Sequence, residues 1–409
     1  MRVFLLAGEA SGDRLGAALM AGLKSLETVD FQGVGGPLMQ AEGMESLFPM
    51  DELSVMGLAE ILPKYPHLRR RLHQTAEAVL DAQPGVLITI DSPDFSLRVA
   101  KLVKAQSDIR TVHYVAPSVW AWRAGRAAKM ARVIDHVLAL LPFEPPYMEA
   151  AGMTAEFVGH PVAAQPVPDA AAIAAWREGA HIHPAQKILL VAPGSRQGEV
   201  RRLGPVFLQT ARRMLAKDPG LAVVVPAAET VAKEVTALFS PLGEALRMVA
   251  PSASSADKRL AFAAADAALC ASGTVTLELA AAGTPMVAAY RTTWLTAQIV
   301  RRVIKVNTAN LINLISGRTV VPEFLQEFCT VDTLSEALHP LLHDPDAAAA
   351  QRDAFDEVMT VMGRGGMPPG ARAARSVLGC LRGEIQPSGI ALEDAIPPGP
   401  HDRHKGRLG

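Results

Sequence analysis

The sequence predicts an α/β protein with two domains, each built on a doubly wound parallel sheet. Short, continuous apolar runs alternate with longer amphipathic segments rich in alanine. Apolar strands between helical segments are typical of parallel sheets that are covered on both faces. The alternation stops near residues 160–187 and then starts afresh. Since 49% of the 409 residues are hydrophobic, the chain is long enough to bury two cores.

The predicted strands are short aliphatic runs, each followed by a turn and then by a segment with helical periodicity. This order of elements indicates βα units whose helices pack on the faces of a sheet. We expect strands at Val3–Ala7, Val86–Ile90, Thr111–Val115, Val137–Leu141, Ile188–Ala192, Ala222–Val225, Ala267–Cys270 and Met286–Ala289.

The domain boundary is predicted in the proline- and alanine-rich stretch HPVAAQPVPDA, which begins at His160. A short helix around Trp176 follows it before the strand at Ile188. We therefore expect a first domain over residues 1–165 and a second over 185–345. Helices over about 345–383 are expected to pack back on the first domain. The polar, proline-rich end of the chain, 385–409, is predicted to be disordered.

Composition excludes several classes of protein. A formal net charge of −1 gives no general reason to expect a nucleic-acid partner. Cys270, Cys329 and Cys380 are far apart, which argues against a zinc ribbon or a disulfide framework and fits a reducing, cytoplasmic compartment. No run reaches the roughly 18–20 apolar residues that cross a bilayer. We therefore expect a soluble or peripheral protein, without a repeat of 20–50 residues.

The first glycine-rich turn, GEASGD at 8–13, lies between a predicted strand and a predicted helix. Its backbone N–H groups would face the crevice at the carboxyl edge of the sheet, where an anion or a sugar binds. A tight βα connection that simply needs glycine explains the pattern equally well. The GxGxxG fingerprint of dinucleotide binding fails here, because its third and sixth positions are Ala10 and Asp13. The candidate residues for binding an acceptor, meaning a substrate whose hydroxyl group attacks, are Glu9, Ser11, Gly12 and Asp13.

A pair of carboxylates follows the strand Val86–Ile90 in the motif DSPDF. At the end of a strand, Asp91 or Asp94 could accept a proton from an attacking hydroxyl. The alternative is that Asp91 caps the next helix and Asp94 complements its dipole. We favour capping for Asp91, although it stays a candidate acceptor contact, and catalysis for Asp94. The DxxD spacing does not indicate a metal–diphosphate clamp, and no metal or other cofactor is predicted.

The segment HYVAPSVWAWR at 113–123 follows another strand and holds two of the four tryptophans in the chain. Aromatic faces line many sugar and acyl pockets, and an arginine can contact a phosphate. A tryptophan pair in the core or at an interface is the competing interpretation. The candidate acceptor contacts here are Ser118, Trp120, Trp122 and Arg123.

Two turns in the second half have the features of phosphate sites. In PGSR at 193–196, Gly194 opens the turn, Ser195 is a candidate N-cap and Arg196 projects from it; Glu199 opens the following helix. Hydrogen-bond donors at a helix start, next to a guanidinium, suit a diphosphate.

The other turn, ASGT at 271–274, follows the strand ending at Cys270 and precedes a helix over 275–282 that stops at Gly283. Ser272, Gly273 and Thr274 offer donors to phosphate oxygens, and Glu278 could accept hydrogen bonds from a ribose; a solvated helix position is its alternative. Two such turns in one domain suggest a diphosphate leaving group that is held without metal as its charge develops.

Apolar and basic residues are mixed between Met56 and Leu72, a pattern that suits an anionic membrane surface. An ordinary helix pair with solvated arginines is the alternative. The predicted membrane patch comprises Met56, Leu58, Ile61, Leu62, Lys64, Leu68, Arg69, Arg70, Arg71 and Leu72.

Taken together, these motifs resemble the lipid-A-disaccharide synthase family of glycosyltransferases, family 19. The matching stretches are AGEASGD, DSPDF, HYVAPSVWAWR, LPFE, VGHP, PGSR, ASGT and NLISGR, and they occur in family order from residue 3 to about 382. Ala116 departs from the serine that many relatives have, and the tail after 385 matches no family pattern.

The resemblance implies a GT-B fold, with two Rossmann-like domains that face each other across a cleft. It implies an inverting transfer from UDP-2,3-diacylglucosamine to 2,3-diacylglucosamine 1-phosphate, which forms a β-1,6-linked disaccharide and UDP. Asp94 would then be the base and Arg196 would stabilise the leaving UDP. The same resemblance implies three further donor-site residues, Asn313, Glu323 and Gln326. It also implies peripheral attachment to the cytoplasmic face of the inner membrane, and the family offers a precedent for a homodimer with exchanged C-terminal parts.

Two other classes of function stay open at this point. Another GT-B enzyme that uses a UDP-sugar, such as a peptidoglycan glycosyltransferase or a UDP-sugar 2-epimerase, would share the turns of the second half. A lipid-binding or regulatory α/β protein would bind ligand without releasing UDP. A dehydrogenase is disfavoured by the failed GxGxxG match.

Overall fold

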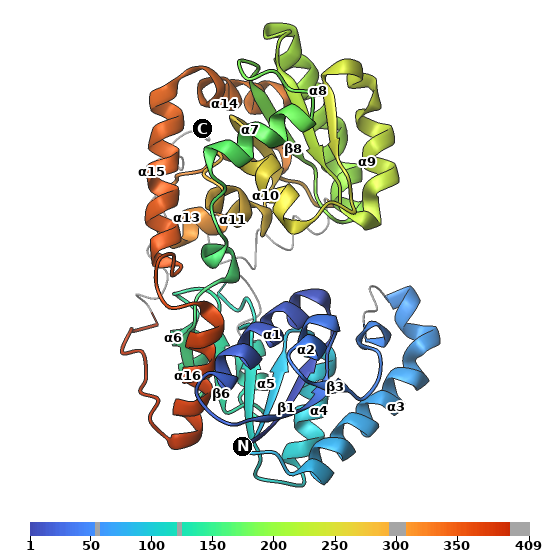
Figure 1. Cartoon of the computed structure of the whole chain (residues 1–409), viewed down its shortest axis with the longest axis vertical. Coiled ribbons are helices and arrows are strands. Elements are labelled where there is room, and N and C mark those ends of the chain that lie inside the picture. Colours follow the sequence, from blue (N-terminus) through green and yellow to red (C-terminus); the bar gives the residue numbers. More distant parts are fainter. Residues whose placement is uncertain (54–57, 121–124, 294–307, 393–409) are drawn as a thin grey trace, which may run out of the picture. The chain divides into compact units, whose positions relative to one another are not determined.

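A computed structural model describes residues 1–53, 58–120, 125–293 and 308–392, with the side chains of 58–64 left out. The chain forms two compact units. The first combines Met1–Ala164 with the described part of Met362–Ile396, and the second is Gln165–Val361. Each unit has its own sheet with helices packed around it (Figure 1). The predicted α/β class is confirmed by these two parallel sheets.

In the described residues of the first unit, seven strands form one parallel sheet in the order β3-β2-β1-β4-β5-β6-β7. The strands β1, β4 and β5 are buried apart from the first residue of β1 and of β5, as continuous apolar runs predict. The strands are β1 (Arg2–Ala7), β2 (Asp30–Val34), β3 (Glu45–Ser46), β4 (Val86–Ile90), β5 (Arg110–Tyr114), β6 (His136–Ala139) and β7 (Thr154–Phe157).

Helices cover this sheet because each presents an apolar stripe to it. They are α1 (Ala10–Lys24), α2 (Pro37–Ala41), α3 (Leu58–Ala82), α4 (Pro93–Lys104), α5 (Gly125–Met130), α6 (Pro145–Glu149) and α16 (Pro369–Arg382). Short 3₁₀ turns at Met50–Glu52 and Pro161–Ala164 complete the unit.

The second unit repeats the architecture with six described strands in the order β10-β9-β8-β11-β12-β13, all parallel. The strands are β8 (Ile188–Ala192), β9 (Ala222–Pro226), β10 (Leu246–Val249), β11 (Ala267–Ala271), β12 (Met286–Tyr290) and β13 (Glu323–Leu325). The described helices are α7 (Ala170–Gly179), α8 (Gln197–Lys217), α9 (Ala232–Phe239), α10 (Ser255–Ala263), α11 (Val275–Ala281), α13 (Leu311–Ser316), α14 (Val331–His343) and α15 (Pro345–Val361), with 3₁₀ turns at Glu229–Val231, Ser240–Ala245 and Gln326–Phe328.

The chain order of the strands gives each sheet one topological switch point. From β1 the chain moves to β2 and β3 on one side, and it then returns to β4 on the other side. The second sheet does the same between β8 and β11. In open α/β sheets, ligands bind outside the carboxyl ends of the strands at such points. The turns after β1, β4, β8 and β11 are therefore the expected places for ligand binding.

The C-terminal end of the chain returns to the first unit later than the sequence suggested. Helix α15 belongs to the second unit, and the return starts at Met362 rather than near residue 345. Helix α16 then packs on the first sheet, where Ser376 Oγ lies 2.8 Å from Nε2 of the buried His136. Burial lowers the pKa of His136 to about 4, so this imidazole is neutral at pH 7. Of the tail predicted to be disordered, 385–392 is described, and Ser388 there is bonded to Glu149.

The contact between α1 and α16 depends on two glycines. A Cβ on Gly22 would lie 2.6 Å from the carbonyl oxygen of Gly370, and a Cβ on Gly370 would lie 2.3 Å from that of Ala18. Both contacts are with backbone atoms, which cannot rotate away. The two helices therefore approach closely only because neither has a side chain at this point.

We expect Gly370→Ala to lower the free energy of unfolding by about 1–3 kcal/mol, since the new methyl group would force the two backbones apart. Urea unfolding followed by circular dichroism measures this change. Gly379→Ala, on the same helix, is the matched control because its Cβ would meet only the flexible side chain of Ile385. Equal stabilities of the two variants would contradict the proposed close packing.

Candidate functional site

The turns after β1 and β4 lie side by side at the switch point of the first sheet. A Cβ on Gly8 would come within 2.7 Å of Ser92 Oγ, so the two turns are in contact. The structure thereby brings together two of the predicted motifs, GEASGD and DSPDF. Within them the side chain of Ser11 is exposed, and Glu9 is half-buried.

Backbone strain is concentrated at this edge. Asp91 and Ser92 have φ values of 51° and 45°, and Val115, directly after β5, has a φ of 86°. Residues other than glycine rarely adopt such angles, and a β-branched residue does so least of all. Backbone hydrogen bonds hold them there, from Asp91 N to the Tyr114 oxygen and from Val115 N to the Leu138 oxygen, both at 3.0 Å. Strain of this kind is typical of functional sites.

The two carboxylates of DSPDF differ in their surroundings. Asp91 Oδ1 accepts a hydrogen bond from Ser92 N at 2.9 Å, and the N-cap of α4 is Ser92, so the capping role favoured for Asp91 is wrong. Asp94 lies exposed in the first turn of α4. Among the described residues, its carboxylate has no hydrogen-bond or ion-pair partner. Of the two, Asp94 is therefore the one available to an incoming hydroxyl.

Asp13 has a structural role in place of the predicted contact with an acceptor. Its side chain is 3% exposed and accepts hydrogen bonds of 2.9–3.0 Å from the backbone N–H groups of Gly36, Leu38 and Met39. It thus neutralises the N-terminus of α2, where a carboxylate is favourable. Gly12 is also buried, because a Cβ there would lie 3.3 Å from Ala7 Cβ. The Asp13 carboxylate is thus used within the protein, whereas the contact of Gly12 with an acceptor stays a prediction.

Trp120 belongs to the core rather than to an open aromatic pocket. It is 7% exposed, its ring meets that of Phe143 edge-on at 5.3 Å, and its Nε1 donates to Glu144 Oε1 at 3.4 Å. Burial raises the pKa of the Glu144 carboxyl to about 8. Ser118 is exposed near the same edge, whereas Trp122 and Arg123 lie outside the described residues. Nothing in the letters LPFE signalled that Glu144 would be the partner of Trp120.

The turn PGSR follows β8 and leads into α8. Its N-cap is Arg196, which has an extended backbone and no side-chain cap, so the prediction of Ser195 as N-cap is wrong. Gly194 has a φ of 119°, a conformation that favours glycine. The side chain of Arg196 is 78% exposed, and its Nη1 lies 3.8 Å from Glu199 Oε1. The guanidinium is thus largely exposed, apart from its contact with Glu199, and can meet an anion at this helix start.

The side chain of Glu199 stabilises this turn. Its Oε2 accepts a hydrogen bond from Ser195 N at 3.1 Å, and a Cβ on Gly194 would lie 2.6 Å from both its Cβ and its Oε2. Thr230 Oγ1 donates a hydrogen bond of 3.0 Å to the carbonyl oxygen of Ser195. The N–H group of Ser195, one of the donors expected to bind the ligand, therefore donates to a carboxylate of the protein instead.

The turn ASGT follows β11 on the other side of the switch point. Ser272 N is bonded to the Ala289 oxygen at 2.8 Å, and Ser272 Oγ donates to Glu323 Oε1 at 2.6 Å. The second carboxylate oxygen of Glu323 accepts from Thr308 Oγ1 at 2.7 Å. Glu323 therefore joins this turn to the segment that begins at residue 308. Gly273 is half-buried, and Thr274 and Glu278 are exposed at the start of α11.

Asn313 is a structural hub in the described protein. It is 5% exposed, and its Oδ1 accepts from Val320 N at 2.9 Å and from Val321 N at 2.8 Å, while its Nδ2 donates to the Val321 oxygen at 2.9 Å. These bonds use its amide to hold the chain before β13, and the donor contact that the resemblance implied stays a prediction. Gln326 has a φ of 53°, and its Oε1 accepts from Thr292 N at 3.3 Å.

The predicted membrane patch is only partly available. Glu52 receives two hydrogen bonds of 2.7 Å from Arg71 and one contact of 2.5 Å from His67 Nε2, and the Arg71 guanidinium stacks on Phe48. Arg71 is therefore a structural residue, and Leu72 packs against the core. Leu68 is half-buried. Arg69 and Arg70 are exposed, as is Tyr65, which was not predicted; Met56 and the side chains of Leu58, Ile61, Leu62 and Lys64 lie outside the described residues.

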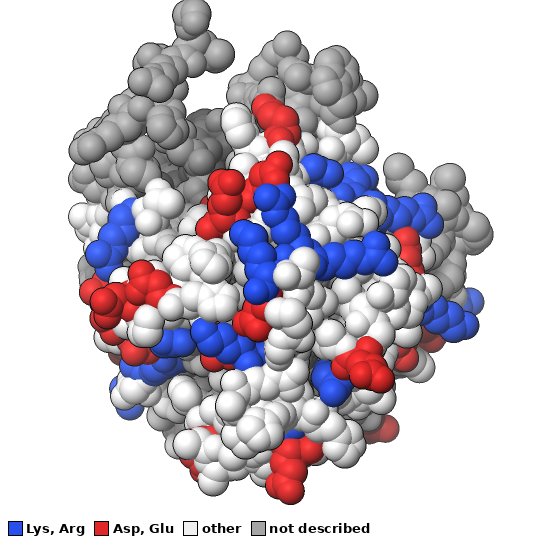
Figure 2. Space-filling view, turned by 90° about the horizontal axis from the view of Figure 1, so that it is seen from above, with Lys and Arg blue, Asp and Glu red and all other residues white. Residues whose placement is uncertain are grey.

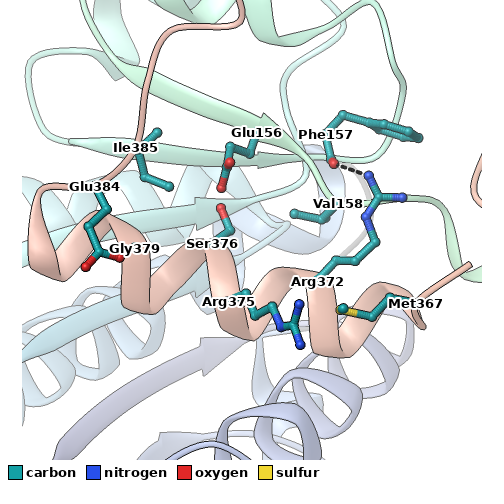
Figure 3. A pocket seen from close by; sticks show the side chains of 10 residues that line it. All are labelled: Glu156, Phe157, Val158, Met367, Arg372, Arg375, Ser376, Gly379, Glu384 and Ile385. Atoms are coloured by element: carbon teal, nitrogen blue, oxygen red, sulfur yellow. Dashed lines mark hydrogen bonds between the residues drawn. The ribbon is translucent and has the colours of Figure 1, made fainter.

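A cavity of about 410 Å³ lies elsewhere in the first unit, between β7 and α16. Figure 3 shows its lining, in which Arg372 donates to the carbonyl oxygen of Phe157 at 2.7 Å. Glu156 and Glu384 face it along with the basic residues Arg372 and Arg375. Apart from Val158, the first residue of VGHP, its lining residues lie outside the selected motifs, so the cavity is not part of the candidate site.

Surface charge, metal-ligating groups and helix hydropathy add three observations. Basic and acidic side chains are interspersed on the face in Figure 2, with a short basic band near its centre, so this face is not uniformly cationic. Within the described ranges, no three His, Cys, Asp or Glu side chains are grouped in a way that could hold a metal ion. In the same part of the chain, no helix has both the length and the apolar character to cross a bilayer.

Comparison with known proteins decides the family. The family model described as "Lipid-A-disaccharide synthetase" matches residues 3–366. A lipid-A-disaccharide synthase from Ruegeria pomeroyi is 58% identical over 94% of this chain and 96% of its own length, and one from Rhodospirillum centenum is 47% identical over 93% and 94%. The chain belongs to the lipid-A-disaccharide synthase family. The resemblance found in the sequence is thereby confirmed.

Solved structures show the same fold at low identity. A UDP-GlcNAc 2-epimerase from Neisseria meningitidis, bound to UDP-GlcNAc, is 11% identical with a TM-score of 0.64, covering 94% of this chain and all of that one. The calicheamicin glycosyltransferase CalG4 is 17% identical with a TM-score of 0.54, over 94% and 99%. These likenesses confirm the predicted GT-B fold. The high identity to synthases, rather than the fold, supports a glycosyltransferase over an epimerase.

The Glu52–Arg71 pair yields a prediction about stability. Hydrogen bonds from Arg71, the largest cause, together with the charges of Arg71 and His67, lower the pKa of Glu52 from 4.5 to about 2. A carboxyl whose pKa is lower in the folded state stabilises the fold above pH 4.5, and this contribution is lost as the pH falls towards 2. We expect Glu52→Gln to lower the free energy of unfolding at pH 7 by about 1–2 kcal/mol.

Urea unfolding at several pH values tests this expectation. The difference between Glu52→Gln and the wild type should shrink as the pH falls from 4.5 towards 2. Glu45→Gln removes the same charge from an exposed position on β3 and serves as the control. A difference that stays constant with pH would contradict the assignment.

Proposed function

We propose that this chain transfers 2,3-diacylglucosamine from its UDP derivative to 2,3-diacylglucosamine 1-phosphate, forming the β-1,6-linked disaccharide 1-phosphate and UDP. The observation that carries the proposal is the placement of PGSR and ASGT on either side of the β8/β11 switch point. Two helix starts and an exposed guanidinium at this point suit a diphosphate. Membership of the family supplies the identity of the sugars.

Asp94 is the proposed general base. It would accept the proton of the acceptor 6-hydroxyl while the hydroxyl oxygen attacks the anomeric carbon of the donor. The bond from this carbon to the diphosphate oxygen breaks on the opposite side, so the configuration is inverted and UDP leaves with the electron pair. An exposed carboxylate without a partner among the described residues supports this role, because neither of its oxygens is held by another group.

Arg196 and the turns at Gly194–Ser195 and Ser272–Thr274 are proposed to stabilise the charge that develops on UDP. The exposed Glu278 would accept hydrogen bonds from the ribose. Glu323, Asn313 and Gln326 support the site by holding neighbouring segments in place. On the acceptor side we retain Glu9, Ser11, Asp91 and Ser118.

The acylated substrates give a physical reason for a peripheral position on the cytoplasmic face of the inner membrane, which we propose. The exposed part of α3, with Tyr65, Arg69 and Arg70, has the aromatic and basic side chains that suit an anionic surface. We further propose a homodimer that exchanges α16, since the close α1–α16 contact would form equally well between two chains.

Asp94→Asn is expected to lower kcat by at least about a hundredfold, since the amide cannot take the hydroxyl proton. The assay measures UDP released from UDP-2,3-diacylglucosamine, with and without the acylated acceptor, in the presence of EDTA. The Kd for UDP should stay near that of the wild type. Asp108→Asn, at an exposed position beyond the end of α4, is the control. Retained turnover in Asp94→Asn would remove it from the role of base, and UDP release that ignores the acceptor would overturn the proposed reaction.

The triple variant Tyr65→Ser, Arg69→Gln, Arg70→Gln is expected to bind vesicles containing anionic lipid at least about tenfold more weakly, since each basic residue near such a surface contributes about 1 kcal/mol. Sedimentation with vesicles measures the partition coefficient. The control variant Val361→Ser, Arg212→Gln, Lys217→Gln removes the same charge and one exposed apolar side chain elsewhere. Equal partitioning of the two variants would count against a membrane role for α3.

A further inference from the structure

Arg202 is a residue of α8 that the proposed mechanism has not used. It lies six residues after the N-cap Arg196, and its Nε donates to the carbonyl oxygen of Arg291 at 3.2 Å. Side chains on a helix lean towards its N-terminus, so the surface that Arg202 covers is that of the preceding turn. The guanidinium therefore lies towards the start of α8, where the donor diphosphate is proposed to bind.

Gly198 makes room for this guanidinium. A Cβ on Gly198 would lie 2.7 Å from Nη2 of Arg202, 3.5 Å from its Cζ and 3.7 Å from its Nη1. The whole guanidinium thus rests against the first turn of the helix. A side chain at this position would have to displace the flexible end of Arg202, whereas glycine leaves the guanidinium where it is.

The two contacts of Arg202 place it at the edge of the sheet. Gly198 lies in the first turn of the helix that follows β8, and Arg291 comes directly after β12. In the sheet, β11 lies between β8 and β12. A side chain that contacts both elements therefore spans the carboxyl end of β11, where the turn of Ser272 begins and is itself bonded to the end of β12. Arg202 stands at the same edge as both phosphate-type turns.

The charges around Arg202 leave its guanidinium available. Among the residues that the structure describes, neither of its Nη atoms has a hydrogen-bond partner. The adjacent Arg201 behaves differently, because it is exposed and its Nε lies 3.4 Å from Glu234 Oε1. The one acidic group bonded at the turn, Glu199, is directed to Ser195 N and Arg196. The planar fork of a guanidinium matches two phosphate oxygens, which suits a diphosphate.

We propose that Arg202 is a second guanidinium contact for the donor diphosphate, next to Arg196. The inference rests on the proposed function, because it names a further residue of the same donor site. With Arg196 alone, one guanidinium and the helix starts would meet the whole charge of the leaving UDP. With both, each phosphate of the diphosphate can have a guanidinium as its partner.

The test compares four single variants and one double variant of the full chain by calorimetric titration with UDP and by steady-state kinetics. We expect Arg202→Gln to raise the Kd for UDP and the KM for the donor at least tenfold, with the KM for the acceptor and the unfolding midpoint near those of the wild type. Arg201→Gln removes the same charge one residue away and should stay within twofold. Gly198→Ala should push the guanidinium aside and weaken UDP binding, but it should have no effect in the Arg202→Gln background. Arg196→Ala reports on the proposed donor site itself.

The outcomes separate the inference from the proposed function. If Arg196→Ala weakens UDP binding and Arg202→Gln does not, the inference is wrong and the donor site stands. If neither weakens it, the donor site is wrong as well. An equal effect of Arg201→Gln would indicate a general effect of charge and overturn the inference. The same holds if Arg202→Gln lowers binding to anionic vesicles and leaves the Kd for UDP unchanged, because Arg202 would then be a membrane contact.

Discussion

The carboxyl edge of a parallel sheet is the constraint on which the candidate site depends. All strands of such a sheet end at the same edge, and the reversal of strand order leaves a crevice there between two neighbouring strands. In this protein the reversals fall between β1 and β4 and between β8 and β11. The four turns that follow these strands carry Gly8, Asp91, Gly194 and Ser272. Within each sheet, topology therefore brings together two motifs that lie far apart in the sequence.

Carboxylate side chains of the protein accept hydrogen bonds from helix starts and turns near this edge. Polar backbone groups at the end of a buried strand need partners, and unpaired ones are costly. Asp13 supplies a carboxylate to the start of α2, Glu199 to the turn after β8, and Glu323 to the turn after β11. In each case the carboxylate fixes backbone or hydroxyl donors, and for Glu199 and Glu323 these donors lie in the turns where the ligand is expected. The same device explains why the N–H of Ser195 is already bonded while the guanidinium of Arg196 still projects outward.

Sequence patterns were sufficient for the inner strands and for the glycine turns. Buried parallel strands are continuous apolar runs, and β4 and β8 have the predicted bounds. The edge strands β3, β7, β10 and β13, and β2 next to an edge, were not predicted, because short or partly exposed strands lack such runs. Side-chain partners were beyond the sequence for a different reason. Trp120 with Glu144, and Asn313 with the chain near Val321, pair through tertiary packing that no local spacing records.

The two halves of the chain contribute unequally to identifying the reaction. The turns of the second half suit a nucleoside diphosphate, and an epimerase that is 11% identical has the same fold and is bound to UDP-GlcNAc. A UDP site of this kind is compatible with either chemistry. The family match decides for the transferase, and a transferase needs a base for a second substrate, which we expect in the first half. Asp94, exposed beside strained backbone at Asp91 and Ser92, is the residue that we propose for this role. The first half thus carries the proposed base, and the second half carries the groups that are proposed to bind the leaving UDP.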